Sequence, residues 1–330
     1  MPINTTTARG LSQYLTDFSI ELAQSDSVFR AASILPTVGV RKQADMFRVY
    51  NANNLREVAM RPLADGTQTA AGDVDWSEGF YYTRVWGLHV DYGPQTKANA
   101  DDDLQLGRMA TDYLTSQYML LQEKEWYEKL FRTGVWSTNL TGGTDFGYFD
   151  DAGTDVINVI RRQITRQQIL SGGIRPNVLV MTRLVAEALM EHPDIIDRIN
   201  RGQTTGPAIA DEATLAAILG LGRVVILEAV TGQLDSETGE TTNVMLGGDN
   251  MLLMYLDPRA TTRSRTAAAR FDWTGLSQYM TVGQTVRTIE LDPVIEGTTR
   301  YEIKAAFDFQ VVAPDLGTYF QGVLTPASGA

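Results

Sequence analysis

The chain contains no cysteine and only two histidines, His89 and His192. The absence of cysteine excludes a disulfide framework, a cysteine-ligated zinc or iron–sulfur site and a thiol nucleophile. A metal centre with several histidine ligands would need both histidines on one ion. These two scarcities remove much of the usual catalytic and metal-binding chemistry, and the absence of cysteine fits a reducing cytoplasm.

Lysine is also scarce, because the 330 residues include 23 Arg but only five Lys. Lys and Arg together number 28 against 40 Asp and Glu, so the formal net charge is −12. An acidic chain is poorly suited to wrapping nucleic acid, whose affinity comes from cations that neutralise phosphates. Arginine is enriched and lysine depleted at protein interfaces, so this usage indicates extensive protein–protein contact. A GC-rich genome, which favours arginine codons, is the alternative explanation.

Long apolar runs are missing as well, so the sequence predicts no membrane span. The polar residues 1–10 lack the apolar core of a signal peptide, and we expect no secretory leader. The length suggests about two domains at roughly 150 residues each. Hydrophobic residues make up 43% of the chain, enough to build a core without disulfide or metal support.

Motifs for phosphate binding and nucleophilic catalysis are absent. Gly220-Leu221-Gly222 lacks the third glycine of a dinucleotide loop, and no Gly-x-x-x-x-Gly-Lys occurs. Ser12 and Ser277 each follow Gly-Leu but lack the second glycine of a nucleophile elbow. His89 falls within a predicted strand and His192 at the end of a predicted helix, where packing or helix-dipole roles are common.

Two charged groups have simple explanations. The acidic cluster lacks EF-hand spacing and is interpreted as a solvated loop; its members are Asp145, Asp150, Asp151 and Asp155. Arg161, Arg162 and Arg166 are interpreted as an exposed helix face. We therefore assign no catalytic, cofactor-binding or metal-ligating residue, expect no cofactor, and expect no enzymatic activity.

The predicted elements form a mixed α+β chain without repeated βαβ units. Residues 101–132 carry helical spacing and predict a helix about 45 Å long at about 1.5 Å per residue. Residues 81–92 alternate as a strand, and the turn-rich residues 53–78 predict a surface loop, so 48–92 predicts a long hairpin arm. An apolar stripe predicts a helix over 11–22. Further helices are predicted at 155–170, 182–190, 194–199 and 211–219, and strands at 47–50, 177–181, 223–227, 243–246, 251–256, 285–291 and 301–312.

The succession of these parts resembles the tailed-bacteriophage major capsid protein of the HK97 fold. The segments that carry the resemblance are 177–181 with the following helix to 192, Gly220-Leu221-Gly222-Arg223-Val224-Val225, Gly247-Gly248-Asp249-Asn250, and 301–320. No single motif is diagnostic, and the order of the segments carries the weight. The resemblance implies an N-terminal arm (1–47), an extended loop (48–92), a peripheral domain (93–154 and 285–330) with a spine helix (101–132), and an axial domain (155–284).

The resemblance also implies a function. It implies a structural protein that self-assembles into hexamers and pentamers of an icosahedral shell around phage double-stranded DNA, without sequence-specific binding. The implied partners are further copies of the chain and portal, scaffolding and decoration proteins, and the implied location is the virion after assembly in the host cytoplasm. Two alternatives remain open: an encapsulin-type compartment of the same fold, and a soluble α+β hydrolase that uses His89 or His192.

One departure from the family generates a prediction. The type member links its subunits covalently through a lysine of the extended loop, whereas residues 43–96 here contain no lysine. We predict a shell without covalent links, so mature particles should give the band of the single subunit on denaturing electrophoresis. A ladder made only of covalent multimers would contradict this prediction.

Overall fold

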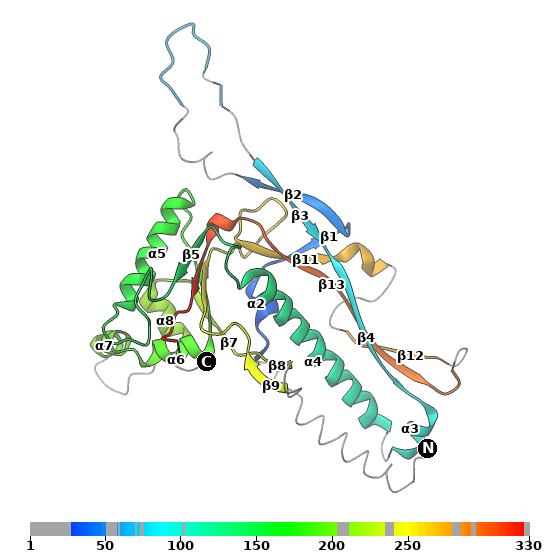
Figure 1. The fold of residues 1–330 in the computed structure, drawn as a ribbon. Helices are drawn as coiled ribbons and strands as arrows, with labels where there is room; N and C mark the ends of the chain where they lie inside the picture. Colours follow the sequence, from blue (N-terminus) through cyan, green and yellow to red (C-terminus); the bar gives the residue numbers. More distant parts are fainter. Residues whose placement is uncertain are drawn as a thin grey trace.

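The computed structural model describes residues 28–50, 58, 60–69, 71–72, 76–100, 103–202, 211–234, 241–278, 285–291 and 295–326. Two five-stranded sheets lie on either side of one long helix, and a two-stranded hairpin projects away from both (Figure 1). No helix among the described residues is long and apolar enough to cross a membrane.

One sheet is organised around the 13-residue strand β13 (Thr299–Val311). Strand β4 (Arg84–Tyr92) pairs with it antiparallel over nine positions, from Thr299↔Tyr92 to Phe307↔Arg84. On its other edge β13 pairs with β12 (Arg287–Glu290) and β11 (Ala268–Trp273), and β11 pairs with β1 (Thr37–Val40). Strand β13 is therefore bonded along both edges.

The helix α4 (Asp103–Leu130) crosses this sheet and contacts β13 and β4. No proline interrupts it, and its apolar side chains recur at spacings of three and four, which places Leu106, Ala110, Leu114 and Tyr118 on one buried face. The helix ends where the Trp136 indole donates a hydrogen bond of 2.7 Å to the carbonyl oxygen of Leu130. Near the helix start, α3 (Pro94–Asn99) follows β4.

The second sheet has the order β5-β14-β10-β6-β7. Its strands are β5 (Thr138–Thr141), β14 (Gly317–Gln321), β10 (Met251–Met254), β6 (Val178–Thr182) and β7 (Arg223–Leu227). Four helices accompany it: α5 (Val156–Leu170), α6 (Arg183–Glu191), α7 (Pro193–Gly202) and α8 (Glu212–Leu219). Strands β8 (Val230–Leu234) and β9 (Thr241–Met245) form a separate ribbon.

This second sheet is buried on both faces. Leu179 and Leu253 belong to a core with α5, α6 and α8, whereas Val180 and Leu252 belong to a core with the C-terminal half of α4. Successive strand residues point to opposite faces, so alternate residues of β6 and β10 fill two different cores. The all-apolar run of β10 follows from this double burial.

Most predicted elements are confirmed. The long helix runs over 103–130. The helix predicted at 155–170 begins after Asp155, whose carboxylate accepts a hydrogen bond from the Asn158 amide. Helix α8 begins in the same way after Asp211, whose carboxylate accepts from the Thr214 amide. Helix α6 begins after Thr182, which occupies the N-cap position, but the buried Thr182 hydroxyl has no hydrogen-bond partner among the described residues. The helix predicted over 11–22 lies outside the described residues.

The predicted strand over 81–92 is divided in two. Thr83 separates β3 (Trp76–Tyr82) from β4, and its amide and hydroxyl both donate to the carbonyl oxygen of Gln43. The side chains that face the protein interior therefore change at Thr83 from odd to even positions. Tyr81 is buried and Tyr82 is exposed before it, whereas Trp86 and Val90 are half-buried after it. Short strands β1, β5, β8, β11 and β14 were not predicted.

The predicted domain segments do not map one to one onto the two sheets. Strand β11 lies within the predicted axial range 155–284 but pairs with β13. Strands β5 and β14 lie within the predicted peripheral ranges but pair with each other and, through β14, with β10. The chain thus crosses repeatedly between the sheets.

The close approach of β14 to Trp136 generates a prediction. A Cβ built at Gly317 would lie 2.0 Å from the buried Trp136 ring, so Gly317→Ala should lower the free energy of unfolding by about 1–3 kcal/mol through overpacking. Gly87→Ala, in β4, is the matched control, because its Cβ would lie 3.6 Å from Lys304. Denaturant titration of both variants measures the difference, and equal stabilities would contradict the packing argument.

Candidate assembly surface

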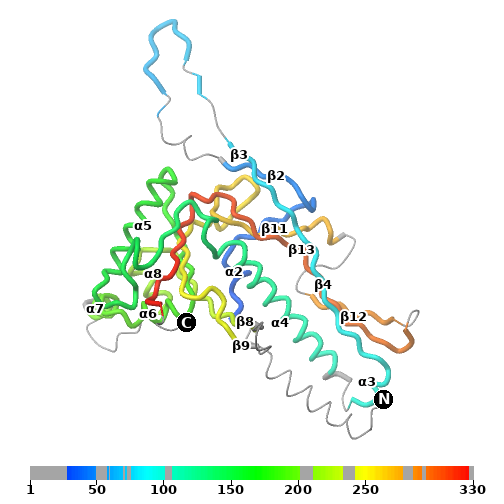
Figure 2. Tube along the Cα trace, in the orientation of Figure 1, coloured from blue at the N-terminus to red at the C-terminus, as the bar shows by residue number. Residues whose placement is uncertain are grey.

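A two-stranded hairpin extends from the body of the protein. Strand β2 (Ala44–Tyr50) pairs antiparallel with β3 from Ala44↔Tyr82 to Tyr50↔Trp76. Beyond its end, residues 60–69 lie far from both sheets (Figure 2). This is the hairpin arm that the sequence predicts, and its described part has too few neighbours within the chain to form a core of its own.

The outer face of the hairpin carries several large apolar side chains that nothing in the described chain covers. Met46 and Phe80 lie opposite each other in the register and are 53% and 64% exposed. Tyr82 and Trp76 extend the same face along β3, and the Arg48 guanidinium lies 5.0 Å from the centre of the Trp76 ring. Further exposed apolar side chains lie beyond the strands: Val58, Met60 and Leu63. The opposed residues Arg48 and Glu78 lie on the same face, between Phe80 and Trp76. We call the exposed side chains of Met46, Trp76, Phe80 and Tyr82 the apolar strip, and exposed apolar side chains gathered on one face are typical of a contact surface.

The root of the hairpin is fixed to the first sheet. On the inner face, Phe47 and Tyr81 are buried and stack on Phe271, with ring centres 5.5 and 4.8 Å apart. The Phe47 ring occupies the space over Gly79, where a Cβ would lie 2.4 Å away. This stacking holds the strip at a defined angle to the body.

Asp308 of β13 completes the root. It is 2% exposed, its Oδ2 accepts a 3.1 Å hydrogen bond from the Tyr82 amide, and its Oδ1 pairs with Lys129 at the end of α4. Lys129 also pairs with Glu125 at 3.2 Å. The carboxylate therefore joins the hairpin, the central strand and the long helix.

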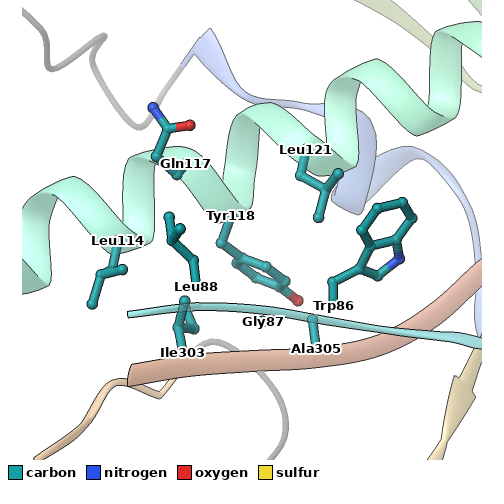
Figure 3. Close-up of a pocket in the computed structure, with 9 residues that line it drawn as sticks. All are labelled: Trp86, Gly87, Leu88, Leu114, Gln117, Tyr118, Leu121, Ile303 and Ala305. Carbon is teal, nitrogen blue, oxygen red and sulfur yellow. The ribbon is translucent and has the colours of Figure 1, made fainter. Parts of the chain in front are cut away.

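A shallow apolar groove lies between α4 and the paired strands β4 and β13 (Figure 3). It has a volume of about 190 Å³, and its lining residues are Trp86, Gly87, Leu88, Leu114, Gln117, Tyr118, Leu121, Ile303 and Ala305. The Tyr118 ring points from the helix toward the strands, and Leu88 is partly exposed. Apart from Gln117 and the tyrosine hydroxyl, the lining offers little polar chemistry.

The two histidines are not brought together. His89 lies on β4, half-exposed, with its Nε2 3.8 Å from Asp91. His192 is buried after α6, where its ring nitrogens lie 3.2 Å from the Asp151 carbonyl oxygen and 3.2 Å from the Asp194 amide. The His192 ring thus supports the backbone between α6 and α7.

The acidic loop residues hold turns and caps. Asp145 accepts from the Thr141 amide at 2.8 Å and Asp150 from the Thr325 amide at 3.0 Å. Asp151 accepts from Gly153, and Asp155 caps α5. Among the described residues, no group of three or more acidic or histidine side chains is arranged to hold a metal ion.

The predicted arginine face lies on α5 and is largely exposed. Arg161 bonds to the Ile218 carbonyl oxygen, and beside it Ile169 is 72% exposed. The interpretation of 161, 162 and 166 as an exposed helix face therefore agrees with the structure.

Sequence reasoning did not identify the apolar strip. Its signal was present, because Trp76, Phe80 and Tyr82 stand at even positions. Residues 76–78 were predicted to lie in a surface loop. An alternating pattern also shows which side chains share a face of a strand, but it does not show which of the two faces is covered.

The described fold is similar to that of phage capsids of known structure. No protein-family model matches the sequence, and no curated protein is detectably similar to it. A phage-related protein from Bordetella bronchiseptica has a TM-score of 0.67 at 14% identity, over 96% of this chain and 98% of that one. The mature capsid of bacteriophage PhiM1 gives 0.56 at 11% identity, and the capsid of cyanophage P-SCSP1u 0.55 at 12%, each over 92% of this chain and 89% of the other. The predicted α+β, HK97-like fold is confirmed.

The buried carboxylate at the hairpin root generates a prediction. Asp308→Ala leaves the Tyr82 amide without its acceptor, while Lys129 retains Glu125, so the free energy of unfolding should fall by about 1–3 kcal/mol. Asp91→Ala removes an exposed bidentate pair with Arg300 and should cost about 1 kcal/mol or less. Thermal or denaturant unfolding compares the two, and an equal loss would show that the hairpin root does not depend on Asp308.

Proposed function

We propose that the chain is the structural subunit of a protein shell, the major capsid protein of a tailed-phage head. Its confirmed fold is similar to that of phage capsids of known structure, which supports the proposal, and in this proposal the chain has a structural role and no enzymatic one. The observation that carries the proposal is the exposed apolar strip of the β2–β3 hairpin. A monomer gains nothing from projecting Met46, Phe80 and Tyr82 into water, so a second copy of the chain is the partner that explains it.

In this proposal each part has a role in the shell. The hairpin, within the segment 48–92, is the extended loop that lies over a neighbouring copy, and α4 is the spine that supports the peripheral sheet. The second sheet with its helices belongs to the axial domain, around the centre of hexamers and pentamers. Such head-to-tail contacts use different patches on the two partners and close into rings when the rotation allows it.

The remaining assignments follow from the same role. The shell encloses double-stranded DNA without reading its sequence, and its net charge of −12 suits a lining that does not bind the packaged DNA tightly. Portal, scaffolding and decoration proteins are the expected partners, and the virion is the expected location, after assembly in the host cytoplasm.

Electron microscopy of the purified full-length chain tests the proposal directly. Uniform polyhedral shells or capsomer rings would support it, and a lasting monomer would contradict it. An encapsulin-type compartment would give small closed shells around a cargo protein, whereas a phage head would contain DNA when isolated from infected cells.

The hairpin strip generates a specific prediction. Phe80→Asp places a charge at the centre of the strip, so we expect it to reduce assembled particles at least tenfold while leaving the unfolding midpoint of the subunit unchanged, because Phe80 is exposed. Ser77→Asp is the matched control, since Ser77 is exposed on the other face of the same strand. Size-exclusion chromatography measures assembly. Full assembly of the Phe80 variant would mean that the strip is not a subunit contact.

A further inference from the structure

A short helix, α2 (Ala31–Ile34), lies between the long helix and the second sheet and is held at both ends. At its start, the Ala31 amide donates a 2.6 Å hydrogen bond to Oε1 of Glu123 on α4. At its end, the Arg223 guanidinium at the start of β7 donates to the carbonyl oxygens of Ser33 and Ile34. Arg30, just before the helix, pairs with Glu212 of α8. One turn of helix thus joins α4 to β7 and α8.

Glu123 is an unusual residue for this position. It is 1% exposed, and its second oxygen, Oε2, is buried with no hydrogen-bond partner among the described residues. Tyr127, one turn further along α4, is close enough for the two groups to influence each other's ionisation, and its buried hydroxyl also lacks a partner there. An ionised carboxylate in such surroundings is costly unless several donors compensate it.

The charged groups around Glu123 are committed to other partners. Arg30 pairs with Glu212, and Arg223 with the carbonyl oxygens at the end of α2. From the first sheet, Lys129 pairs with Asp308 and Arg270 with Asp272. Close compensation of a charge on Glu123 therefore comes from the backbone amides of Ala31 and Arg30.

We propose that α2 is a protonation-controlled clasp: it holds α4 together with β7 and α8 while Glu123 is protonated, and it loosens when Glu123 ionises. A protonated carboxyl keeps its carbonyl oxygen as the acceptor for the Ala31 amide and leaves no charge in the core. Ionisation places a charge there that only two backbone amides compensate closely, and undocking α2 lets water reach it. This inference concerns motion within one subunit and does not depend on the proposed function.

The raised pKa of Glu123 determines how the docking of α2 changes with pH. Burial raises the pKa of Glu123 from its usual 4.5 to about 7, although the amides of Ala31 and Arg30 act in the opposite direction. The docked state therefore binds the proton more tightly than the undocked state. Docking is strongest below about pH 4.5, weakens as the pH rises to about 7, and is constant at its weakest level above that range.

Hydrogen–deuterium exchange of the full-length chain tests the clasp. After correction for the intrinsic pH dependence of amide exchange, protection of the Ala31 to Ile34 amides should fall at least tenfold between about pH 5.5 and about pH 8.5, because each unit of pKa shift is a tenfold change in the docking equilibrium. Glu123→Gln keeps a carbonyl acceptor but cannot ionise, so its protection should not change with pH. Glu128→Gln, an exposed carboxylate on the same helix, should behave as the parent chain.

Two results would overturn the proposal: protection in the parent chain that does not depend on pH, or the same pH dependence in Glu123→Gln. A measurement on the parent chain covers the case in which that variant does not fold. Infrared difference spectra in D₂O should show one carboxylic-acid band that titrates near pH 7, and the absence of such a band would equally overturn the proposal.

Discussion

The packing of α4 on β13 is the constraint on which the other parts depend. Strand β13 is hydrogen-bonded along both edges and buried over most of its length, so it cannot shift without breaking several ladders together. Helix α4 lies on it through Leu114 and Tyr118, and then continues into the core shared with the second sheet. Both the hairpin and the second sheet take their positions from this contact.

The distribution of apolar residues follows from that arrangement. Where the chain can cover apolar surface by itself it does so completely, as in β6 and β10, whose residues are buried on both faces. On the hairpin, the inner residues Phe47 and Tyr81 are buried against Phe271, but the outer residues have no cover within the subunit. The same strands are therefore buried on one face by folding and left exposed on the other.

Much of the fold could be predicted because its signals are local. Helical spacing located α4, α5 and α8, and the all-apolar runs located β6 and β10. Strand β11 was not predicted because its Ala268-Ala269-Arg270 sequence has no local strand preference. It is stabilised by tertiary contacts instead: Arg270 pairs with Asp272, bonds the Tyr118 hydroxyl at 3.2 Å and lies over the Phe307 ring.

The candidate surface was harder to predict than the fold, for the same reason. The arm could be located from its composition, but its exposed face depends on the phase change at Thr83 and on the Phe271 stack, which join residues far apart in the sequence. Glu123 looks from the sequence like any charged residue of a long helix. Only the placement of α2 over it shows that it is buried.

The pairing of β4 with β13 has a mechanical consequence. A force applied to the hairpin is transmitted through Thr83 to β4. It acts parallel to the strands, across the nine positions at which β4 pairs with β13. Strands loaded in this way must break their hydrogen bonds together rather than one after another, and such a joint resists force far better than one that unzips from its end. A subunit loaded through its hairpin would therefore keep its first sheet together under a force that strands opened one bond at a time could not bear.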